Sequence, residues 1–270
     1  MRLYDYAASA NCFKARLLLA QLGIRYERVP VDIFAGESTT PDYRAKNPAG
    51  RTPVLELDSG QTIAESNAIL LYLGEGTPFV PEELLERARV WQWLFFEQNL
   101  FEPNVGTARF WRLTGRDSAS PEVFAARLES ARAALAVLDD GLRGKDFLLG
   151  ERYTVADVSL YAYAHVAGDT GIDLAAHPAA LTWLRRVEAT PGFANDLEPY
   201  PESARAGAGG RSVHGQEGFA ERRSSLGCDG RSEARTQGAP VARATGATED
   251  AVLGASSAAR RHSRCFAKPS

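Results

Sequence analysis

The spacing of hydrophobic residues separates an alternating first part of the chain from a helical second part. Over the first 75 residues, short apolar runs typical of strands alternate with helical patterns. The expected strands are Arg2–Tyr6, Tyr26–Val31, Val54–Leu57 and Gln61–Ala64, and the expected helices are Ala10–Leu22, Pro41–Lys46 and Ser66–Leu73. This order, βαβ followed by ββα, predicts a small α/β domain built on a four-stranded sheet.

A Gly- and Pro-rich stretch separates the two parts, and every pattern after it is helical. Residues 76–81 read as a linker by composition. Beyond them, apolar residues recur at spacings of three and four in two long segments, which begin near Leu84 and Phe124. We expect Pro103 to interrupt the first long helix. The pattern predicts an α/β domain over 1–75 and an all-helical domain over 82–199.

The last seventy residues have a different composition. Residues 201–270 hold 11 Lys and Arg against 7 Asp and Glu, whereas all four Trp and all nine Tyr lie within 1–200. Such a stretch buries too little apolar surface to offset an ordering cost of ~1–2 kcal/mol per residue. We therefore expect residues 200–270 to form a disordered tail. An RNA-binding arm is the alternative, but its arginines alternate with acids and lack interleaved aromatic residues.

The composition as a whole is that of an ordinary globular protein. Its 270 residues carry a net charge of −3, which argues for neither nucleic acid nor membrane as a partner. No stretch approaches the ~20 apolar residues needed to span a bilayer, and no leader peptide is visible. Three scattered cysteines are too few for a disulfide framework or a zinc site. We expect a cytoplasmic protein without a bound metal.

Pro53 is the most informative single residue. It stands in Arg51-Thr52-Pro53-Val54-Leu55, where a turn enters a strand. A proline has no N–H and a fixed φ, so it suits a strand start or a cis turn. In a thioredoxin-like fold, a cis proline at this place is expected to turn the N–H and C=O of the next residue toward a bound peptide. Val54 is then expected to present a strand edge to a peptide-like ligand.

Four motifs in one order resemble the glutathione S-transferases, most closely the bacterial enzymes that use serine or asparagine. They are Ser9-Ala10-Asn11-Cys12, Asn47-Pro48 with Thr52-Pro53-Val54-Leu55, Glu65-Ser66-Asn67-Ala68-Ile69, and Thr154-Val155-Ala156-Asp157. The resemblance covers roughly residues 1–195. It implies a thioredoxin-like domain that binds glutathione, an all-α domain that binds a second substrate, and a homodimer.

The resemblance implies that Ser9 activates the glutathione thiol. A free thiol with a pKa of ~8.5 is only a few per cent thiolate at pH 7, and lowering it by two units requires ~2.7 kcal/mol. A charge-assisted hydrogen bond contributes ~1.5–3 kcal/mol, so one hydroxyl donor suffices. Ser9 precedes the first helical turn, and Asn11 is a second donor candidate. For both residues, a helix cap or turn is the structural alternative.

Two nearby residues invite a catalytic interpretation that we do not favour. Cys12 ends a Ser-x-x-Cys sequence in which the attacking first cysteine of redox relatives is replaced by serine. It is therefore expected to be a small buried residue. Asp157 lies three residues after Thr154, the spacing of a capping box, so we expect it to serve folding.

The other site residues follow from the two charged ends of glutathione. Glu65 and Ser66 open a helix, where free N–H groups favour an anion, so Ser66 suits the glutamyl carboxylate and Glu65 its ammonium group. Arg51 is expected to meet the glycyl carboxylate, and Lys14 is a weaker candidate for a local ion pair. In the helical domain, Phe101, Phe110 and Trp111 are candidates for the second-substrate pocket, with burial in the core as the alternative.

The sequence therefore predicts a glutathione transferase that joins the glutathione thiolate to a small electrophile. Glutathione is a co-substrate, and no tightly bound cofactor is expected. A glutathione-dependent disulfide reductase of the same fold is one alternative, because relatives of that type also carry an Asn beside the site residue. A non-catalytic binding module is another. The electrophile itself has no readable signature.

Overall fold

The structure is a computed structural model that describes residues 1–205. The disordered tail predicted for residues 200–270 lies, from residue 206 onward, outside the described residues. Its first residues, however, pack against the fold: Ala204 is fully buried and Tyr200 is partly buried in the same hydrophobic cluster. The packed part of the chain therefore extends to at least Ala204.

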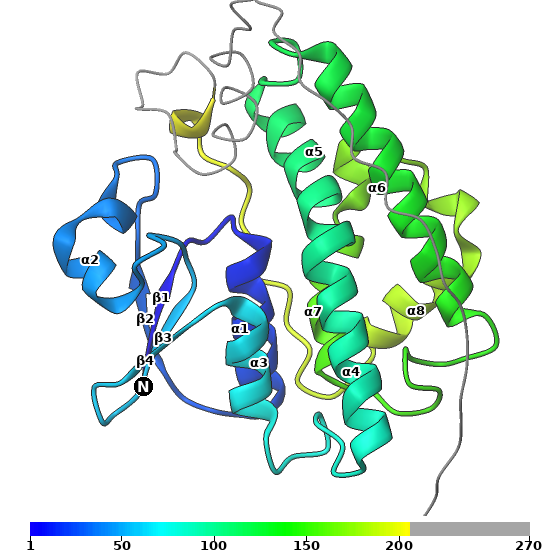
Figure 1. The fold of residues 1–270 in the computed structure, drawn as a ribbon, viewed down its shortest axis with the longest axis horizontal. Helices are drawn as coiled ribbons and strands as arrows, with labels where there is room; N and C mark the ends of the chain where they lie inside the picture. Colours follow the sequence, from blue (N-terminus) through cyan, green and yellow to red (C-terminus); the bar gives the residue numbers. More distant parts are fainter. Residues whose placement is uncertain (206–270) are drawn as a thin grey trace, which may run out of the picture. The chain divides into compact units, whose positions relative to one another are not determined.

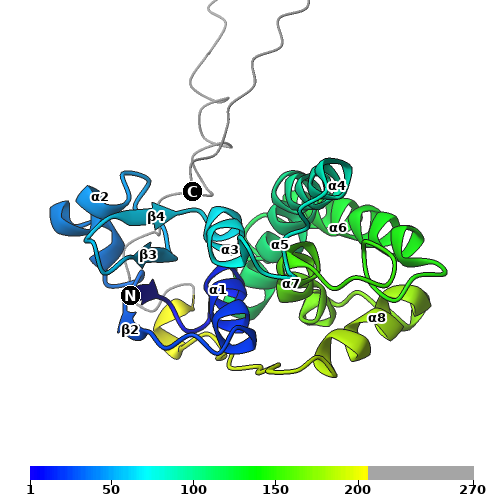
Figure 2. The same cartoon turned by 90° about the horizontal axis from the view of Figure 1, so that it is seen from below.

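The first part of the chain is a four-stranded mixed sheet with helices on both faces. Its elements are β1 (Arg2–Asp5), α1 (Ala10–Gln21), β2 (Glu27–Pro30), the 3-10 helix η1 (Glu37–Thr39), α2 (Pro41–Lys46), β3 (Val54–Glu56), β4 (Thr62–Ala64) and α3 (Ser66–Gly74). The strand order is β2-β1-β3-β4, with β2 parallel to β1 and the other pairs antiparallel. Helices α1 and α3 lie on the face toward the helical part, and α2 lies on the other (Figures 1 and 2).

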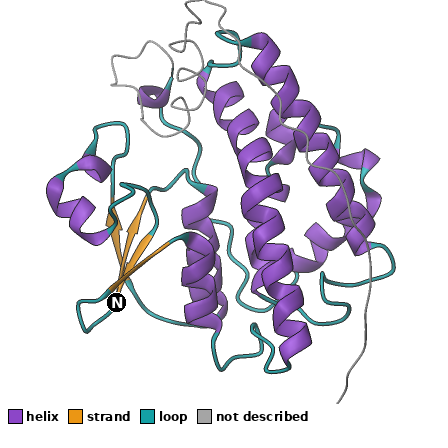
Figure 3. Ribbon diagram, viewed as in Figure 1, coloured by secondary structure: helices purple, strands orange, loops and turns teal. Residues whose placement is uncertain are grey.

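The second part is entirely helical, as Figure 3 shows. Its elements are α4 (Leu84–Phe96), the π-helical segment η2 (Glu97–Phe101), α5 (Glu102–Thr114), α6 (Pro121–Leu142), α7 (Val155–Ala164), the 3-10 helices η3 (Ala167–Thr170) and η4 (Leu174–Ala176), α8 (Pro178–Glu188) and the 3-10 helix η5 (Glu202–Ala204). The expected fold class, a thioredoxin-like α/β domain followed by an all-α domain, is confirmed.

Helix α7 lies at the centre of the helical part. All ten of its residues are buried, which fits its contacts with α1, α4 and α8. Asp157 accepts hydrogen bonds from the backbone of Thr154 and Leu148 and from Trp183 Nε1. The capping box predicted from the sequence is present. Burial raises the Asp157 pKa to about 6, although these hydrogen bonds act in the opposite direction.

The long helix changes geometry ahead of Pro103. Between α4 and α5 the chain forms the π-helical segment η2, so the interruption expected there takes the form of a wide turn. This turn carries Glu97 into the interior, where it is fully buried. Further along α5, a Cβ at Gly106 would lie 2.7 Å from the Tyr163 ring, so only glycine allows α5 to approach α7 this closely.

After α8, residues 191–205 run back past α1 to the first part of the chain; we call them the return segment (Figure 2). Asp196 accepts from Arg16 Nε at 2.8 Å, and the Glu198 N–H donates to the Ala7 carbonyl at 3.3 Å. The segment ends in η5 against α5, where Arg116 donates to the Ala204 carbonyl at 2.7 Å. No helix within residues 1–205 is both long and apolar enough to cross a bilayer.

Candidate active site

Ser9 caps the first turn of α1. Its Oγ accepts from the Cys12 N–H at 3.3 Å, and its own N–H donates to the Tyr6 carbonyl at 2.9 Å. The side chain is partly exposed. Because a hydroxyl both donates and accepts, capping uses a lone pair of the Ser9 oxygen and not the hydroxyl proton. The cap and the donor interpretation of Ser9 are therefore compatible.

Asn11 joins the start of α1 to the start of α3. Its Oδ1 accepts from the Ser66 hydroxyl at 3.2 Å, and its Nδ2 donates to Glu102 Oε1 at 3.4 Å. Ser66 is buried and Glu102 begins α5. Two residues that the sequence proposed separately thus lie in direct contact. The second N–H of the Asn11 amide remains available to a ligand.

The first turn of α3 has an open N-terminus. Within residues 1–205 no side chain caps this helix, although Glu65 stands at the cap position. Glu65 has a φ of 68°. Within residues 1–205, no other non-glycine residue has a positive φ. Such a conformation costs of order 1–3 kcal/mol and is concentrated at ligand-binding sites. An uncapped helix start beside a buried serine is suited to a carboxylate.

The third part of the site is the turn before β3. The Arg51 carbonyl accepts from Asn47 Nδ2 at 2.8 Å and from the Tyr43 hydroxyl at 2.9 Å, which explains the Asn47-Pro48 motif in terms of turn structure. The Thr52–Pro53 bond is cis, as expected. The Thr52 hydroxyl is within hydrogen-bonding reach of the Cys12 thiol, so this turn lies beside the start of α1.

The expectation that Val54 presents a strand edge needs correction. Val54 is fully buried, and its strand β3 lies inside the sheet, where Val54 is opposite Tyr4 of β1 and Ala64 of β4. An interior strand has partners on both sides and offers no edge. Thr52, which precedes the strand and is partly exposed, is the nearer candidate for backbone pairing with a peptide.

A buried ion pair lies directly behind Ser66. Lys14 and Glu97 both have fully buried side chains, and their Nζ and Oε1 atoms are 2.8 Å apart. Lys14 also donates to Ser66 Oγ at 3.4 Å, and Asn67 Nδ2 donates to Glu97 Oε2 at 3.0 Å. The sequence suggested a local partner for Lys14. The actual partner is 83 positions away and belongs to the helical part.

Glu102 extends this polar network toward α7. The Tyr163 hydroxyl donates to its Oε1 at 3.4 Å, next to the bond from Asn11. Burial raises the Glu102 pKa, while Lys14 lowers it and Glu97 raises it. The site therefore combines acids and a cation from both parts of the chain. Arg51, at its edge, is exposed and contributes to the field at Glu102.

Cys12 is inert, as expected from the sequence. Its side chain is fully buried, and Sγ accepts from the Tyr6 N–H at 3.4 Å. Burial, together with the Asp5 carboxylate, raises the thiol pKa to about 11. A thiol with such a pKa holds almost no thiolate at neutral pH.

The three aromatic candidates of the helical part separate in the structure. Phe101 is fully buried in the main core, so it does not line an open pocket. Trp111 is half-buried on α5. Phe110 instead packs against Phe34 and Tyr200, with ring centroids 6.3 and 5.5 Å apart. Of the three, Phe110 is the one beside the start of α1, because its cluster also contains Ala8 and Cys12.

Several site residues escaped sequence analysis because their partners lie far away along the chain. Glu97 and Glu102 read as ordinary helix residues, and Tyr6, Phe34 and Tyr200 come from three separate segments. One signal was present: Lys14 lies between Phe13 and Ala15 in an apolar helix, and a lysine within such a helix requires a buried partner.

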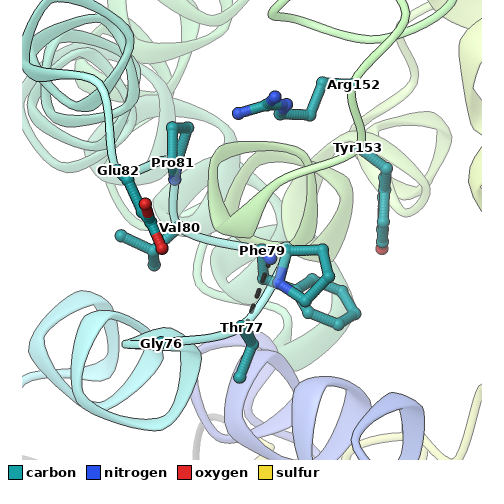
Figure 4. Close-up of a pocket in the computed structure, with 9 residues that line it drawn as sticks. Gly76, Thr77, Phe79, Val80, Pro81, Glu82, Arg152 and Tyr153 are labelled. Carbon is teal, nitrogen blue, oxygen red and sulfur yellow. Dashed lines mark hydrogen bonds between the residues drawn. The ribbon is translucent and has the colours of Figure 1, made fainter.

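A pocket of about 610 Å³ lies elsewhere, between the linker and the loop before α7. Figure 4 shows its lining, with Arg152 and Tyr153 facing Thr77, Phe79 and Glu82. Arg152 already pairs with Glu86 at 2.8 Å, and Tyr153 bonds to Gln21. None of the expected site residues lines it. Among residues 1–205, no group of three or more His, Cys, Asp or Glu side chains could hold a metal ion.

Comparison with known proteins gives matches over both parts of the chain. Residues 8–75 match the family model of the glutathione S-transferase N-terminal domain, and residues 121–202 that of the C-terminal domain. A glutathione S-transferase from Pseudomonas fluorescens [Pf-5] is 40% identical with a TM-score of 0.72, covering 73% of this chain and 98% of that chain.

Two further similarities bear on the chemistry. A glutathione transferase family member from Pseudomonas fluorescens pf-5, solved with two glutathione bound, is 26% identical with a TM-score of 0.64, covering 73% of this chain and 92% of that chain. The disulfide-bond oxidoreductase YfcG of Escherichia coli (strain K12) is 28% identical over 199 residues, which are 71% of this chain and 92% of that protein.

Proposed function

Because the chain belongs to the glutathione S-transferase family, we propose that it is a glutathione transferase of the serine type, which conjugates glutathione to a small electrophile. The observation that carries the proposal is Ser9: its hydroxyl stands at the start of α1, where its oxygen caps the helix by accepting from the Cys12 N–H. Ser9 is close in sequence to Asn11, which bonds to Ser66, and to Cys12, which lies beside Thr52.

The Ser9 hydroxyl donates to the glutathione sulfur and favours its thiolate form. Such a charge-assisted bond contributes ~1.5–3 kcal/mol, and the α1 N-terminus adds ~0.3–1 kcal/mol. Together they supply the ~2.7 kcal/mol that lowers a thiol pKa by two units. Asn11 contributes its second amide N–H. The thiol proton leaves to solvent, because Ser9 is too weak an acid and too weak a base to hold it.

The two ends of glutathione are held by charge. Its glutamyl carboxylate lies at the open start of α3, on the Ser66 hydroxyl and the helix N–H groups, with the buried Lys14 behind. Its ammonium group is held by Glu65. Thr52, next to Pro53 and Val54, pairs with the cysteinyl backbone, and Arg51 attracts the glycyl carboxylate.

In the reaction itself, the thiolate attacks an electrophilic carbon and a C–S bond forms. With an aryl halide, the carbon–halogen bond breaks and the halide leaves with its electron pair. The electrophile lies against Phe110 and its neighbours, because this aromatic cluster includes Ala8, the residue before Ser9. No step requires a tightly bound cofactor.

Glutathione-dependent disulfide reduction is the second candidate, favoured by the similarity to the oxidoreductase YfcG and by Asn11. Here the same thiolate attacks a disulfide sulfur, so one S–S bond forms while another breaks and a thiolate leaves. Neither reaction uses Cys12, since its thiol is buried. The proposed binding of glutathione is common to both.

A direct comparison of two substrates separates these functions. The full chain is given glutathione with an aryl halide and, separately, with a mixed disulfide of glutathione, and kcat/KM is measured for each. A transferase turns over the halide preferentially, and Ser9→Ala lowers that rate by about 10- to 100-fold. Preference for the disulfide identifies the reductase. A chain that does not bind immobilised glutathione is neither, and would be a binding module of this fold.

A homodimer is part of the proposal. Large apolar side chains are exposed on α3 and α4, including Tyr72, Leu84 and Phe95, the last two 74% and 66% exposed. Large exposed apolar surfaces mark interaction sites, and we assign the dimer contact to these helices. Sedimentation of the full chain is expected to give a dimer that Phe95→Glu dissociates. A monomeric wild-type protein would contradict this part.

A further inference from the structure

Four aromatic rings beside the proposed thiolate form a closed ring of contacts. Tyr6 contacts Phe34 at 5.8 Å between centroids, Phe34 contacts Phe110 at 6.3 Å, Phe110 contacts Tyr200 at 5.5 Å, and Tyr200 contacts Tyr6 at 6.5 Å. We call these residues the aromatic box. They come from the end of β1, the loop after β2, α5 and the return segment. Their common neighbours are Ala8 and Cys12.

The box contains a buried hydroxyl without a partner. Tyr6 is 9% exposed, and its Oη has no hydrogen-bond partner within residues 1–205. A buried polar group left unpaired costs about 1–3 kcal/mol, so such groups call for an explanation. Burial raises the Tyr6 pKa, so at neutral pH the group is a phenol that can donate. An oxygen acceptor inside the box would satisfy it.

Two guanidinium groups lie against the box, and they differ in their partners. Arg109 covers Tyr200 at 5.2 Å and is neutralised by Asp169 at 2.8 Å. Arg116 covers Phe110 at 4.8 Å, and no carboxylate within residues 1–205 lies within ion-pair distance of it. Its Nη1 donates to the neutral Ala204 carbonyl at 2.7 Å. A carboxylate is a stronger partner for a guanidinium than a carbonyl is.

From these contacts we infer that the second substrate is a planar aromatic electrophile that carries a carboxylate. This inference rests on the proposed function and names its substrate class. The aromatic ring of the substrate packs within the aromatic box. Its carboxylate forms an ion pair with Arg116 and accepts a hydrogen bond from the Tyr6 hydroxyl. A neutral aromatic compound would use the rings but leave the Tyr6 hydroxyl unpaired and Arg116 on its carbonyl.

Entry of the substrate requires Tyr200 to move outward with the return segment. The Arg116 bond to Ala204 is one of the contacts that hold this segment, along with the Glu198 bond to Ala7 and the Arg16 pair with Asp196. A carboxylate that takes Arg116 therefore loosens the segment as it binds. A neutral compound has no carboxylate to replace the Ala204 carbonyl as the partner of Arg116. This difference adds to the selectivity for acids.

Binding of an unreactive pair of ligands tests the inference apart from catalysis. The full chain is titrated calorimetrically with para-nitrobenzoate and with its methyl ester, which share a ring and differ in charge. We expect the acid to bind at least about tenfold tighter, the effect of one charge-assisted contact. Arg116→Gln is expected to abolish that difference, Arg116→Lys to retain part of it, and Tyr6→Phe to reduce it severalfold.

The matched control is Arg132→Gln, which removes an exposed arginine of α6 away from the box and should leave both affinities unchanged. Melting curves confirm that each variant is folded. Equal binding of acid and ester by the wild-type chain, or a preference for the acid that survives Arg116→Gln, would overturn the inference.

Turnover then separates this inference from the proposed function. A chlorodinitrobenzoate and its methyl ester are compared with glutathione, each rate divided by its uncatalysed rate; sulfur replaces chloride, which leaves with the bonding pair. Selective binding of the acid without turnover of either compound supports the carboxylate site and contradicts the transferase. Turnover of both without selectivity supports the transferase and overturns the carboxylate site.

Discussion

The two sides of the proposed site are held together by different kinds of interaction. On the glutathione side, polar groups from α1, α3 and η2 are already joined through Asn11, Ser66 and the buried pair of Lys14 and Glu97. On the second-substrate side, the aromatic box holds rings from four segments, and two of them, Phe110 and Tyr200, are only partly buried. The first side is fixed by hydrogen bonds, and the second by apolar contact.

The difference corresponds to what each side must recognise. A ligand with fixed charged ends is bound by donors and acceptors that are pre-oriented and costly to disturb. Aromatic contacts have little directional demand, so a ring contributed by a terminal segment can move aside for a substrate. We therefore expect the first side to be rigid and the second to be adaptable, and the following changes test that contrast.

The largest effect is expected from the buried ion pair. Lys14→Met leaves the fully buried Glu97 without its cation, and removing one partner of a buried pair costs about 3–5 kcal/mol of unfolding free energy. The double variant Lys14→Met with Glu97→Leu removes both charges and is expected to recover most of the loss. Urea denaturation measures both. A single-variant loss below about 1 kcal/mol would show that this side is not rigid.

An intermediate effect is expected from His165, the C-cap of α7, whose ring contacts Phe13 of α1 and Tyr161 of α7. Burial lowers its pKa to about 4, whereas an unfolded histidine titrates near ~6.5. As the pH falls from about 6.5 to about 4, His165 is protonated in the unfolded chain but stays neutral in the folded chain. The free energy of unfolding therefore falls by up to about 2–3 kcal/mol.

The matched variant His165→Asn removes this titration. As the pH falls from about 6.5 to about 4, the wild type is expected to lose more unfolding free energy than the variant does. Above pH ~7 the difference between the two proteins should be constant. Denaturation at several pH values measures it. Parallel pH profiles for the two proteins would show that His165 is protonated normally in the fold.

A smaller effect separates the two sides by affinity. Ser66→Ala is expected to weaken glutathione binding about tenfold, since it removes one hydrogen bond to a charged group, and to leave the KM of the electrophile unchanged. Phe110→Ala is expected to raise the KM of the electrophile, because it removes one ring of the aromatic box, and to leave glutathione binding unchanged. Glutathione titration and steady-state kinetics give both values. If either change moves both ligands equally, the two sides are not separate.

The smallest effect is expected from the unpaired hydroxyl. Tyr6→Phe removes an Oη that has no partner among the described residues, so the unfolding free energy should change by less than about 0.5 kcal/mol or rise slightly. Tyr153→Phe is the matched comparison, because its hydroxyl bonds to Gln21, and it should cost about 1 kcal/mol. Similar losses in the two variants would mean that Tyr6 has a structural partner.

The same contrast separates the features of the fold and the site that the sequence predicts from those that it does not. Local signals decided most of the fold: the caps at Ser9 and Thr154, the strand alternation and the Gly-rich linker all act within a few residues. The same holds for the placement of Ser66 at the start of α3 and of Pro53 directly before β3. Over the first 75 residues, the ends of helices and strands differ from expectation by at most one residue, as fraying ends do.

What the sequence could not predict depends on contacts between distant segments. Glu97 enters the site because a π-helical turn precedes Pro103, and neither the turn nor its direction has a sequence signature. Val54 was expected at a strand edge because the sequence does not show that β3 lies between β1 and β4. The aromatic box needs Tyr200 to return across the fold, and Tyr200 stands at the boundary of a stretch that reads as tail.

The central claim is that Ser9 lowers the pKa of the glutathione thiol, and its direct test is a titration of the bound thiol. The ultraviolet absorbance of the thiolate is followed against pH in the complex of glutathione with the wild-type chain and with Ser9→Ala. We predict a midpoint near pH ~6.5 for the wild type and a return toward ~8.5 for the variant, with glutathione still bound. The same midpoint in both proteins would contradict the account.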